Sequence, residues 1–192
     1  MVVKLNNRCE WGSLDNKMIE YHDREWGVPV HDDRKHFEFL VLDAFQAGLS
    51  WSTILKKREN FRKAFDEFDF YKIAHYDPQK IGLLLKDSGI IRNRLKIEAT
   101  IQNAKCFVKV IEEFGSFDKF IWSFTGNKTI VNSWHSIKQV PASTKESDAM
   151  SKILKKRGFK FVGSTICYAY MQASGLVNDH TIHCFRYKKL EG

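Results

Sequence analysis

The chain has 192 residues, of which 43% are hydrophobic and 14% aromatic. This content is enough for a folded core and excludes a disordered chain. The net charge of +8, from 31 Lys and Arg against 23 Asp and Glu, favours an anionic partner, nucleic acid before a membrane surface. No apolar run approaches a membrane span of roughly 18 residues. Residues 1–8 also lack the apolar core of a signal peptide, so we expect a cytoplasmic protein.

The N-terminal quarter predicts an irregular segment followed by a long amphipathic helix. Residues 1–30 have no clear period, apart from one short helix through residues 18–21. Asp32 or Asp33 could cap the next helix, which runs to about Gly48. The buried face of that helix follows helical spacing and comprises Phe37, Leu40, Val41, Ala44 and Phe45.

The middle of the chain predicts short helices and then a long one. After helices over about 50–57 and 59–65, a shorter helix begins at Asp77-Pro78 and ends at Gly89. The helix that follows carries a regular apolar stripe of Ile97, Ile101, Ala104, Val108 and Ile111. Residues 77–112 are therefore predicted to form a helix, a tight glycine turn and a second helix.

The C-terminal half predicts further helices separated by a loop. Helical spacing continues through Phe117, Phe120, Ile121 and Phe124. Residues 126–142 predict a loop with a short extended piece at 129–131. Ser143 and Glu146 have capping-box spacing and open another helix, and a last apolar helix covers about residues 164–174. The fold class is therefore predicted to be all-α.

Two residues near Gly48 could belong to a pocket. Asp43 lies about one and a half turns before the predicted helix end, and Trp51 lies just past it. A glycine there permits a turn that a residue with a Cβ would strain. The pattern alone favours a tryptophan in the ordinary core and an aspartate in solvent over such a pocket.

Positive charge is clustered in three short runs next to turns, at residues 56–58, 92–96 and 155–157. The turn at Gly89 would direct backbone N–H groups outward at a helix N-terminus, where a phosphate can bind. Arg92 and Arg94 would strengthen such a site. The alternative is solvated helix faces and an ordinary helical hairpin.

Two thiols and two imidazoles lie near the two ends of the chain, at Cys9, His22, His180 and Cys184. Together they would make a closed tetrahedral zinc site, which would be structural and would attach both end segments to the helical body. Neither pair has the C-x-x-C spacing of a zinc knuckle. His183 competes with His180, and other histidines are available at His31, His36 and His135.

Several segments match a known family in order and spacing over nearly the whole chain: 8–11, 21–23, 25–29, 46–51, 54–59, 89–96, 122–124, 155–163 and 175–180. They include Gln-Ala-Gly-Leu-Ser-Trp at 46–51 and Gly-Leu-Val-Asn-Asp-His at 175–180. With them the chain resembles the DNA-3-methyladenine glycosylase I family, within the helix-hairpin-helix DNA glycosylases.

The resemblance implies one all-α glycosylase unit over residues 1–192, with the helix-hairpin-helix region at about 77–112. It also implies one structural zinc ion per chain that joins segments 1–30 and 176–192. The implied zinc ligands are Cys9, His22, His180 and Cys184.

The resemblance further implies where this chain binds DNA. Gly89 lies in a turn that is similar to the family's DNA-binding hairpin, with Arg92 and Arg94 beside it. Gly48 and Leu49 are similar to the element that wedges into the duplex. The implied partner is duplex DNA with alkylated bases, bound by a monomer without any membrane.

The base pocket implied by the resemblance contains both matches and departures. Trp51 matches the tryptophan that stacks on the extruded base, Tyr21 matches a pocket tyrosine, and Trp11 is expected close by. Asp43 stands where members carry the Glu that hydrogen-bonds the methylated adenine, and it is the catalytic candidate. Met18 stands where a second tyrosine is common, and it cannot donate a hydrogen bond.

The implied function is hydrolysis of the N-glycosidic bond of an alkylated purine, 3-methyladenine, after the base is flipped out of the duplex. No lysine is arranged as a Schiff-base nucleophile, so we expect a monofunctional glycosylase. Asp43 and Met18 leave open a glycosylase of altered lesion specificity. A non-catalytic, zinc-stabilised DNA-binding protein is the second alternative, and a bare helical interaction module is disfavoured because pocket and metal residues occur together.

Overall fold

The structure is a computed structural model and describes residues 7–13 and 15–190. The N-terminal stretch weighed as a signal peptide therefore lies almost wholly outside the described residues, as do the outermost parts of the predicted zinc segments, residues 1–6 and 191–192. Helices dominate the described chain, which confirms the predicted all-α class. None of its helices is both long and apolar enough to cross a membrane.

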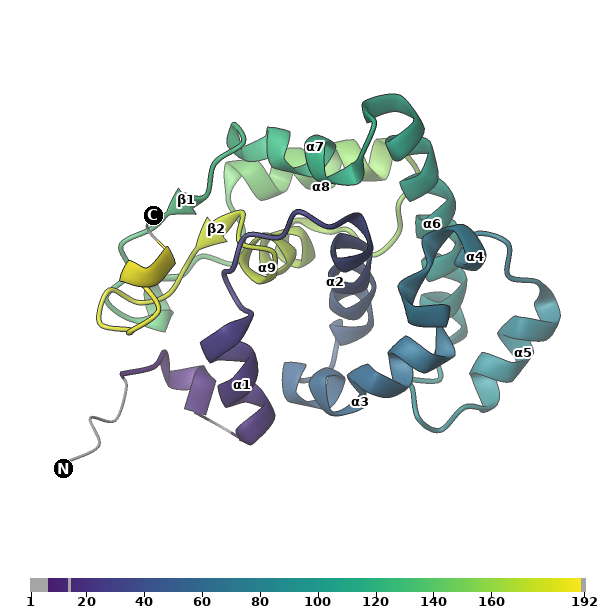
Figure 1. Cartoon of the computed structure of the whole chain (residues 1–192), viewed down its shortest axis with the longest axis horizontal. Coiled ribbons are helices and arrows are strands. Elements are labelled where there is room, and N and C mark those ends of the chain that lie inside the picture. Colours follow the sequence, from purple (N-terminus) through teal and green to yellow (C-terminus); the bar gives the residue numbers. More distant parts are fainter. Residues whose placement is uncertain (1–6, 14, 191–192) are drawn as a thin grey trace.

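A buried helix, α2 (Asp33–Gln46), stands in the middle of the molecule, as Figure 1 shows. Asp32 caps it by accepting a hydrogen bond from the backbone N–H of Lys35. Every residue from His36 to Phe45 is buried. A helix buried all round must have neighbours on all sides, and α2 packs against α3, α6, α7 and α9.

Helix α1 (Asn16–Arg24) precedes α2 in the chain and packs against α3 (Trp51–Ala64), which in turn packs against α2. We predicted two helices over 50–57 and 59–65, and this was wrong. Arg58 marked the apparent break, but it is only 8% exposed and its guanidinium pairs with Glu25 and Glu38. The charged residue therefore faces inward and the helix continues through it.

The next three helices form one side of the molecule (Figure 1): α4 (Phe70–Ile73), α5 (Pro78–Lys86) and α6 (Arg94–Phe114). As predicted, Asp77 caps α5 and proline occupies its first turn. Helix α5 ends three residues earlier than expected, at Lys86. Asn93 caps α6, which Gly115 ends in the left-handed conformation.

The remaining helices are α7 (Phe117–Trp122), α8 (Lys145–Lys156) and α9 (Ser164–Ala173). The capping box of α8 lies one residue later than predicted, with Thr144 and Ser147 exchanging the hydrogen bonds expected of Ser143 and Glu146. Short 3₁₀ turns lie at Glu10–Ser13, Asp66–Phe68, Ser123–Thr125, Ile137–Gln139 and Lys188–Leu190.

A two-stranded parallel sheet joins the C-terminal segment to the predicted loop. Strand β1 (Ile130–Val131) confirms the short extended piece expected there, and it pairs with β2 (Val177–Asn178). Gly175 begins this segment with φ of 74°, and a Cβ there would lie 2.4 Å from the backbone nitrogen of Pro29. Only glycine permits this approach, which brings both end segments to the same side of the molecule (Figure 1).

Candidate active site and metal centre

The four predicted metal ligands meet in one buried cluster. One ligand atom of each lies within 4.8 Å of all the others. The Cys184 Sγ atom is 3.4 Å from His180 Nδ1 and 3.5 Å from His22 Nε2, and Cys9 Sγ is 3.6 Å from His180 Nδ1. Zinc bonds of about 2.3 Å to sulfur and 2.0–2.1 Å to nitrogen give a tetrahedral sulfur–nitrogen edge of about 3.5 Å. The cluster is therefore spaced as a tetrahedral metal would require.

The second ring nitrogen of each cluster histidine has its own partner. His22 Nδ1 lies 2.8 Å from Asp23 Oδ1. His180 Nε2 lies 3.1 Å from the carbonyl oxygen of Trp26. These contacts orient the two rings so that His22 Nε2 and His180 Nδ1 face the cluster, as outer partners of histidine ligands do in known metal sites.

The competing histidines lie elsewhere. His183 is exposed, whereas His180 is fully buried. His31 and His36 both approach Asp118, at 3.0 and 3.2 Å. Chain spacing alone could not make this choice, because it depends on how the C-terminal segment turns after β2.

The predicted base-binding residues line one cavity of about 310 Å³. Met18 and Tyr21 come from α1, Asp43 from α2 and Trp51 from the start of α3, while Trp11 lies in the first 3₁₀ turn. Tyr21 and Trp51 have ring centroids 5.3 Å apart. Elements distant in sequence therefore meet in an aromatic pocket that can hold a flat ring.

Asp43 is the buried acid of this pocket. Its side chain is 4% exposed, and Oδ2 has no hydrogen-bond partner. Burial raises the pKa of the Asp43 carboxyl well above its ordinary value, and the nearby positive charge of Arg58 only partly opposes this. The interpretation of Asp43 as a solvated acid is therefore wrong.

Trp51 packs against the hydrophobic core, as the alternative interpretation expected, but it is only half-buried and also lines the cavity. Its indole Nε1 is buried without a partner. In the described chain three buried side-chain atoms lack a partner, and two of them, in Asp43 and Trp51, belong to this pocket. Unpartnered buried groups are expensive in a folded protein and often await a ligand.

Several lining residues were not predicted as site residues: Trp26, Gln46, Ile137, Ala169, Gln172 and Ala173. Gln46 could have been found, because it lies three residues after Asp43 on the same helix face. The residues of α9 carry no local signal, since they reach the pocket through long-range packing of α9 on α2.

A buried ion network lies behind the Tyr21 wall. The Arg58 guanidinium donates to both carboxylate oxygens of Glu25, at 2.6 and 2.7 Å, and to Glu38 at 2.8 Å. Burial alone would raise the pKa of Glu25, but the hydrogen bonds and charge of Arg58 outweigh it and lower the pKa to about 2. Arg58 therefore belongs neither to a solvated face nor to a DNA-facing run.

The turn between α5 and α6 confirms the predicted order of helix, turn and helix. Arg92 is exposed, and Arg94 forms an exposed 3.3 Å ion pair with Glu98. The backbone N–H of Gly89 donates to Asp87 at 2.7 Å, so this donor is already used within the turn. Phosphate binding here would therefore rest on the arginines and on other backbone groups.

The turn after α2 presents an apolar tip. Gly48 has φ of 81°, and a Cβ added to it would meet no side chain or more distant backbone atom within 4 Å. Leu49 is 38% exposed. Gly48 and Leu49 thus stand next to the pocket residues Gln46 and Trp51 and project into open space.

The model of the family described as methyladenine glycosylase matches residues 11–187. The chain belongs to this family. Over 180 residues it is 50% identical to DNA-3-methyladenine glycosylase 1 of Escherichia coli (strain K12), covering 94% of this chain and 96% of the relative. Membership confirms the predicted enzyme class, a hydrolase acting on N-glycosyl bonds.

Solved structures agree with this methyladenine glycosylase fold. A crystal structure of 3-methyladenine DNA glycosylase I has a TM-score of 0.90 and 51% identity, covering 93% of this chain and 98% of that one. Another, of a variant of such an enzyme in complex with 3-methyladenine, has a TM-score of 0.91 and 34% identity. That match covers 94% of this chain and 97% of the other.

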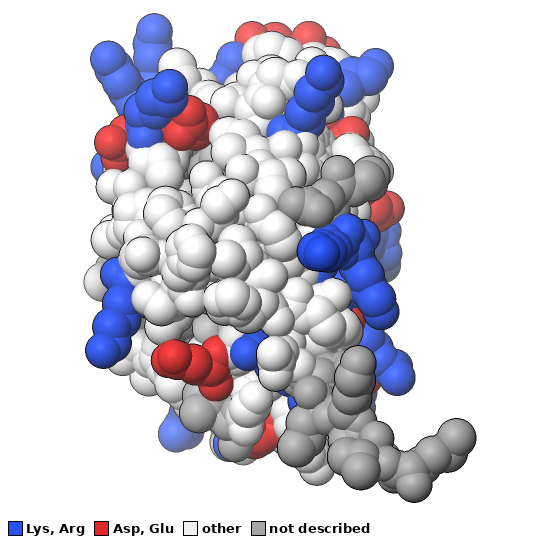
Figure 2. All heavy atoms as spheres, turned by 90° about the vertical axis from the view of Figure 1, so that its left-hand side faces the viewer, with Lys and Arg blue, Asp and Glu red and all other residues white. Residues whose placement is uncertain are grey.

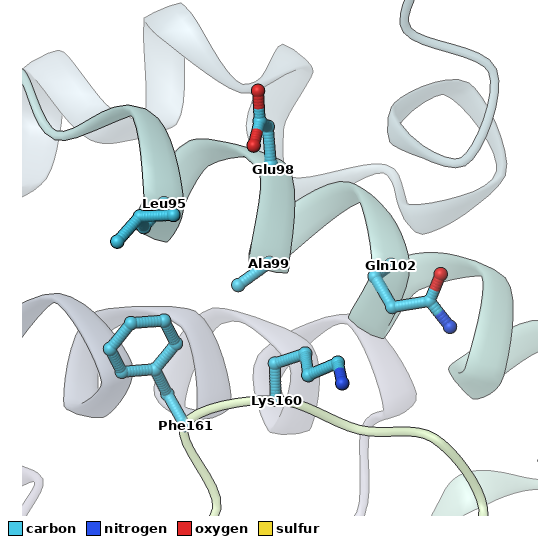
Figure 3. A pocket seen from close by; sticks show the side chains of 6 residues that line it. All are labelled: Leu95, Glu98, Ala99, Gln102, Lys160 and Phe161. Carbon is cyan, nitrogen blue, oxygen red and sulfur yellow. The ribbon is translucent and has the colours of Figure 1, made fainter.

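A second hollow on the surface is lined by none of the residues that we predicted for the base pocket or for DNA binding. It is a groove of about 500 Å³ between α6 and the loop after α8. In Figure 3 the apolar side chains of Leu95 and Ala99 on α6 lie across the groove from Phe161. The two charged residues that line this groove, Glu98 and Lys160, are exposed, so the aromatic pocket with its buried acid is the better candidate for chemistry.

The positive charge of this family member does not gather on the side of its termini. Figure 2 shows that face with Lys and Arg mainly along its margins and uncharged side chains across its centre. Of the three basic runs, two contain arginines with structural partners, Arg58 with Glu25 and Arg157 with Glu113. The run at 92–96 keeps an exposed arginine, Arg92, beside the α5–α6 turn.

Proposed function

We propose that the chain hydrolyses the N-glycosidic bond of 3-methyladenine in duplex DNA, after the damaged base has been flipped into the aromatic pocket. The observation that carries this proposal is Asp43, a buried carboxyl without a partner at the wall of that pocket. The substrate named for the Escherichia coli relative and the solved complex with 3-methyladenine support it.

The chemistry suits a pocket with few catalytic groups. Methylation at N3 gives the adenine ring a positive charge, and departure of the base neutralises it. The leaving group therefore needs no protonation. Trp51 and Tyr21 would bind the cationic ring by stacking and cation–π attraction, which favours a charged base over an ordinary one.

Asp43 would recognise the exocyclic amine of adenine and stabilise the positive ring. A raised pKa keeps an empty pocket free of a buried unpaired charge. A cationic base next to the carboxyl would lower that pKa and favour the carboxylate. Charge recognition and ionisation of Asp43 would then occur together, so the pocket is selective for a cation.

The departures at Asp43 and Met18 affect the fit rather than the reaction class. Aspartate keeps the charge but is one methylene shorter than glutamate. A displacement of about 1 Å can reduce a rate on the order of 100-fold. Met18 is buried and apolar, so it can pack against a ring without donating a hydrogen bond.

Water would complete the reaction by attacking C1′ of the sugar. Among the described residues that line the cavity there is no lysine, which supports a monofunctional glycosylase without strand cleavage. The damaged base costs the least to flip, because its stacking and pairing are already weakened.

The buried cluster fits zinc by its donor set and spacing. Cys9, His22, His180 and Cys184 would hold one ion per chain. Zinc would supply a closed structural link between the two end segments. His22 lies directly behind the pocket wall, with its ring 5.2 Å from that of Trp11, so this link would also fix the wall.

DNA would be held by the α5–α6 turn and opened by the turn after α2. We assign the α5–α6 pair as a helix-hairpin-helix element, with Gly89, Arg92 and Arg94 near the phosphate backbone. Leu49, exposed beside Gly48, would occupy the space that the flipped base vacates. A monomer in the cytoplasm would suffice for this repair reaction.

The test is base release from alkylated duplex DNA, with the released bases separated by chromatography. Release of 3-methyladenine by the wild type supports the proposal. Release of a different alkylated base would instead support altered specificity through Asp43 and Met18. Tight duplex binding with no release would support the non-catalytic alternative. Asp43→Glu and Met18→Tyr, run in parallel, show whether these two departures lower or raise the rate.

A further inference from the structure

A buried lysine connects the two DNA-contacting turns. Lys96 lies in the first turn of α6 and is 7% exposed. Its Nζ donates to the carbonyl oxygen of Phe45 at 2.9 Å and to that of Ala47 at 2.7 Å. Both acceptors are at the C-terminal end of α2, where carbonyl groups lack helical partners.

Within the described chain the ammonium of Lys96 forms no ion pair with an Asp or Glu, and both of its acceptors are backbone carbonyls. Burial lowers the pKa of Lys96. The partial negative charge at the end of α2 stabilises the cation there. A buried amine of this kind is expensive and holds its acceptors in one arrangement.

The same turn is also fixed from within. Gln46 Nε2 donates to the carbonyl oxygen of Leu49 at 2.7 Å, and the Leu49 N–H donates to the Gln46 carbonyl at 2.7 Å. These bonds shape the turn but do not attach it to another helix. Lys96 supplies that attachment, from a position three residues after the cap Asn93 and four after Arg92.

We propose that Lys96 is a positioning residue that fixes the Ala47–Leu49 turn to the start of α6. The phosphate contacts of the α5–α6 turn would then set how far Leu49 enters the duplex. The inference rests on the proposed function of Leu49 as the wedge. It assigns to Lys96 no contact with the base or with DNA.

A rigid connection matters because flipping requires two contacts at a fixed separation. If the turn after α2 moved independently, the hairpin could bind phosphate while Leu49 stayed outside the stack. With Lys96 in place the two turns move as one body. Loss of the amine should therefore weaken base opening more than pocket affinity or duplex binding.

The test compares Lys96→Met with a matched control, Lys105→Met. Lys105 is an exposed residue of the same helix, so the control removes one positive charge without touching the turn. Three measurements separate the effects: affinity for free 3-methyladenine, fluorescence of 2-aminopurine placed beside an abasic analogue in duplex DNA, and single-turnover release of 3-methyladenine.

For Lys96→Met we expect a loss of the fluorescence increase and a release rate lower by about 10- to 100-fold, the effect of a misplaced group. Free-base affinity should stay within about threefold of the wild type, because the tethered turn is not part of the pocket wall. Lys105→Met should match the wild type in fluorescence and release. Lys96→Arg keeps a cation and should recover part of both.

Wild-type fluorescence and release in Lys96→Met would overturn the inference. A loss of free-base affinity equal to the loss of release would also overturn it, since Lys96 would then support the fold in general. If the wild type opens the duplex but releases no base, the proposed chemistry fails while the fluorescence of Lys96→Met still decides the role of Lys96. A wild type that does not open the duplex would overturn both.

Discussion

The Cys/His cluster and the aromatic pocket are neighbouring buried sites that differ in how their polar atoms are paired. In the cluster, both histidines use their outer nitrogen on a fixed partner, and the backbone N–H groups of Thr181 and Arg186 donate to the two sulfurs. In the pocket, Asp43 Oδ2 and Trp51 Nε1 have no partner.

On the proposed assignments, this difference separates a structural metal centre from a binding site. A closed set of ligands with all outer contacts satisfied leaves no position for substrate. An unpartnered buried acceptor or donor costs about 1–3 kcal/mol, and a ligand that pairs with it recovers that energy. The same chain thus uses buried polar groups for rigidity at one site and keeps them free at the other.

Removing a cluster ligand should have the largest effect on the molecule. Cys184→Ala should lose the metal and several kcal/mol of stability, because metal binding is folding free energy in such sites. With about 2–4 °C per kcal/mol for a chain of this size, the melting temperature should fall by about 10 °C or more. Metal analysis and thermal unfolding check this.

Cys106→Ala is the matched control, since Cys106 is a buried thiol on α6 outside the cluster. It should keep the metal and melt close to the wild type. A wild type that is folded and metal-free as purified would remove the structural centre from the comparison.

Removing the charge at the pocket should abolish the acidic limb of the pH profile. Because the pKa of Asp43 in the empty pocket is raised, release measured at subsaturating enzyme should increase with pH until the carboxyl of the free enzyme ionises. Asp43→Asn should lack this limb. Its activation free energy for base release should be higher by about 1.5–3 kcal/mol, the usual contribution of a hydrogen bond to a charged group. Single-turnover release across pH measures both.

Asp43→Asn, which should slow base release, should raise the free energy of unfolding. A raised native pKa means that the stability contributed by protonated Asp43 is present below its unfolded pKa of about 3.9 and is lost as pH rises through the native value. Above that pH, Asp43→Asn should therefore be more stable than the wild type. Equal stability of the two at neutral pH would show that Asp43 is not a strained group.

Substitutions of Trp51 test whether its ring stacks on the base in the pocket. Trp51→Ala should raise the activation free energy of base release by about 1–3 kcal/mol, the contribution of one base stacked on an aromatic ring. Affinity for duplex DNA should stay close to that of the wild type. Trp51→Phe keeps a ring but loses the unpartnered N–H, so it should lie between. Gel-shift titration and release assays distinguish these outcomes, and equal loss of binding and release would make Trp51 a folding residue.

The smallest effect is expected at the exposed cation of the hairpin. Arg92→Ala should weaken duplex binding and reduce its salt slope by about one, with pocket affinity unchanged. Lys109→Ala, an exposed lysine farther along α6, is the control. An unchanged slope for Arg92→Ala would remove this residue from the phosphate contacts.

The fold was predictable wherever apolar period and capping residues coincide. Asp32, Asn93 and Gly115 begin or end their helices where the local chemistry requires it. Prediction failed where a charged residue faces inward. Arg58 interrupts the pattern of α3 locally, but its partners Glu25 and Glu38 lie on other elements, so no local pattern could show that it is buried.

For the candidate site too, some residues could be predicted from the sequence and others could not. The family motifs identified Tyr21, Asp43 and Trp51, and the structure brings these three together. Neither motif nor period indicated that Lys96 is buried, because its acceptors are carbonyls about 50 residues earlier in the chain. Every residue has a backbone carbonyl, so the residue type does not show which carbonyl accepts a hydrogen bond from a distant side chain.

The distance between the cluster ligands in the chain matters for biosynthesis. Cys9 and His180 are 171 residues apart, and His22 and Cys184 are 162 apart. During synthesis on the ribosome, Cys9 and His22 are made first, and His180 and Cys184 are added only after all of the helical body has been synthesised. On the proposed zinc assignment, metal loading would follow folding of that body. A translation product that stopped before His180 would lack half of the ligands, so bound metal would mark chains that were translated past their last helix.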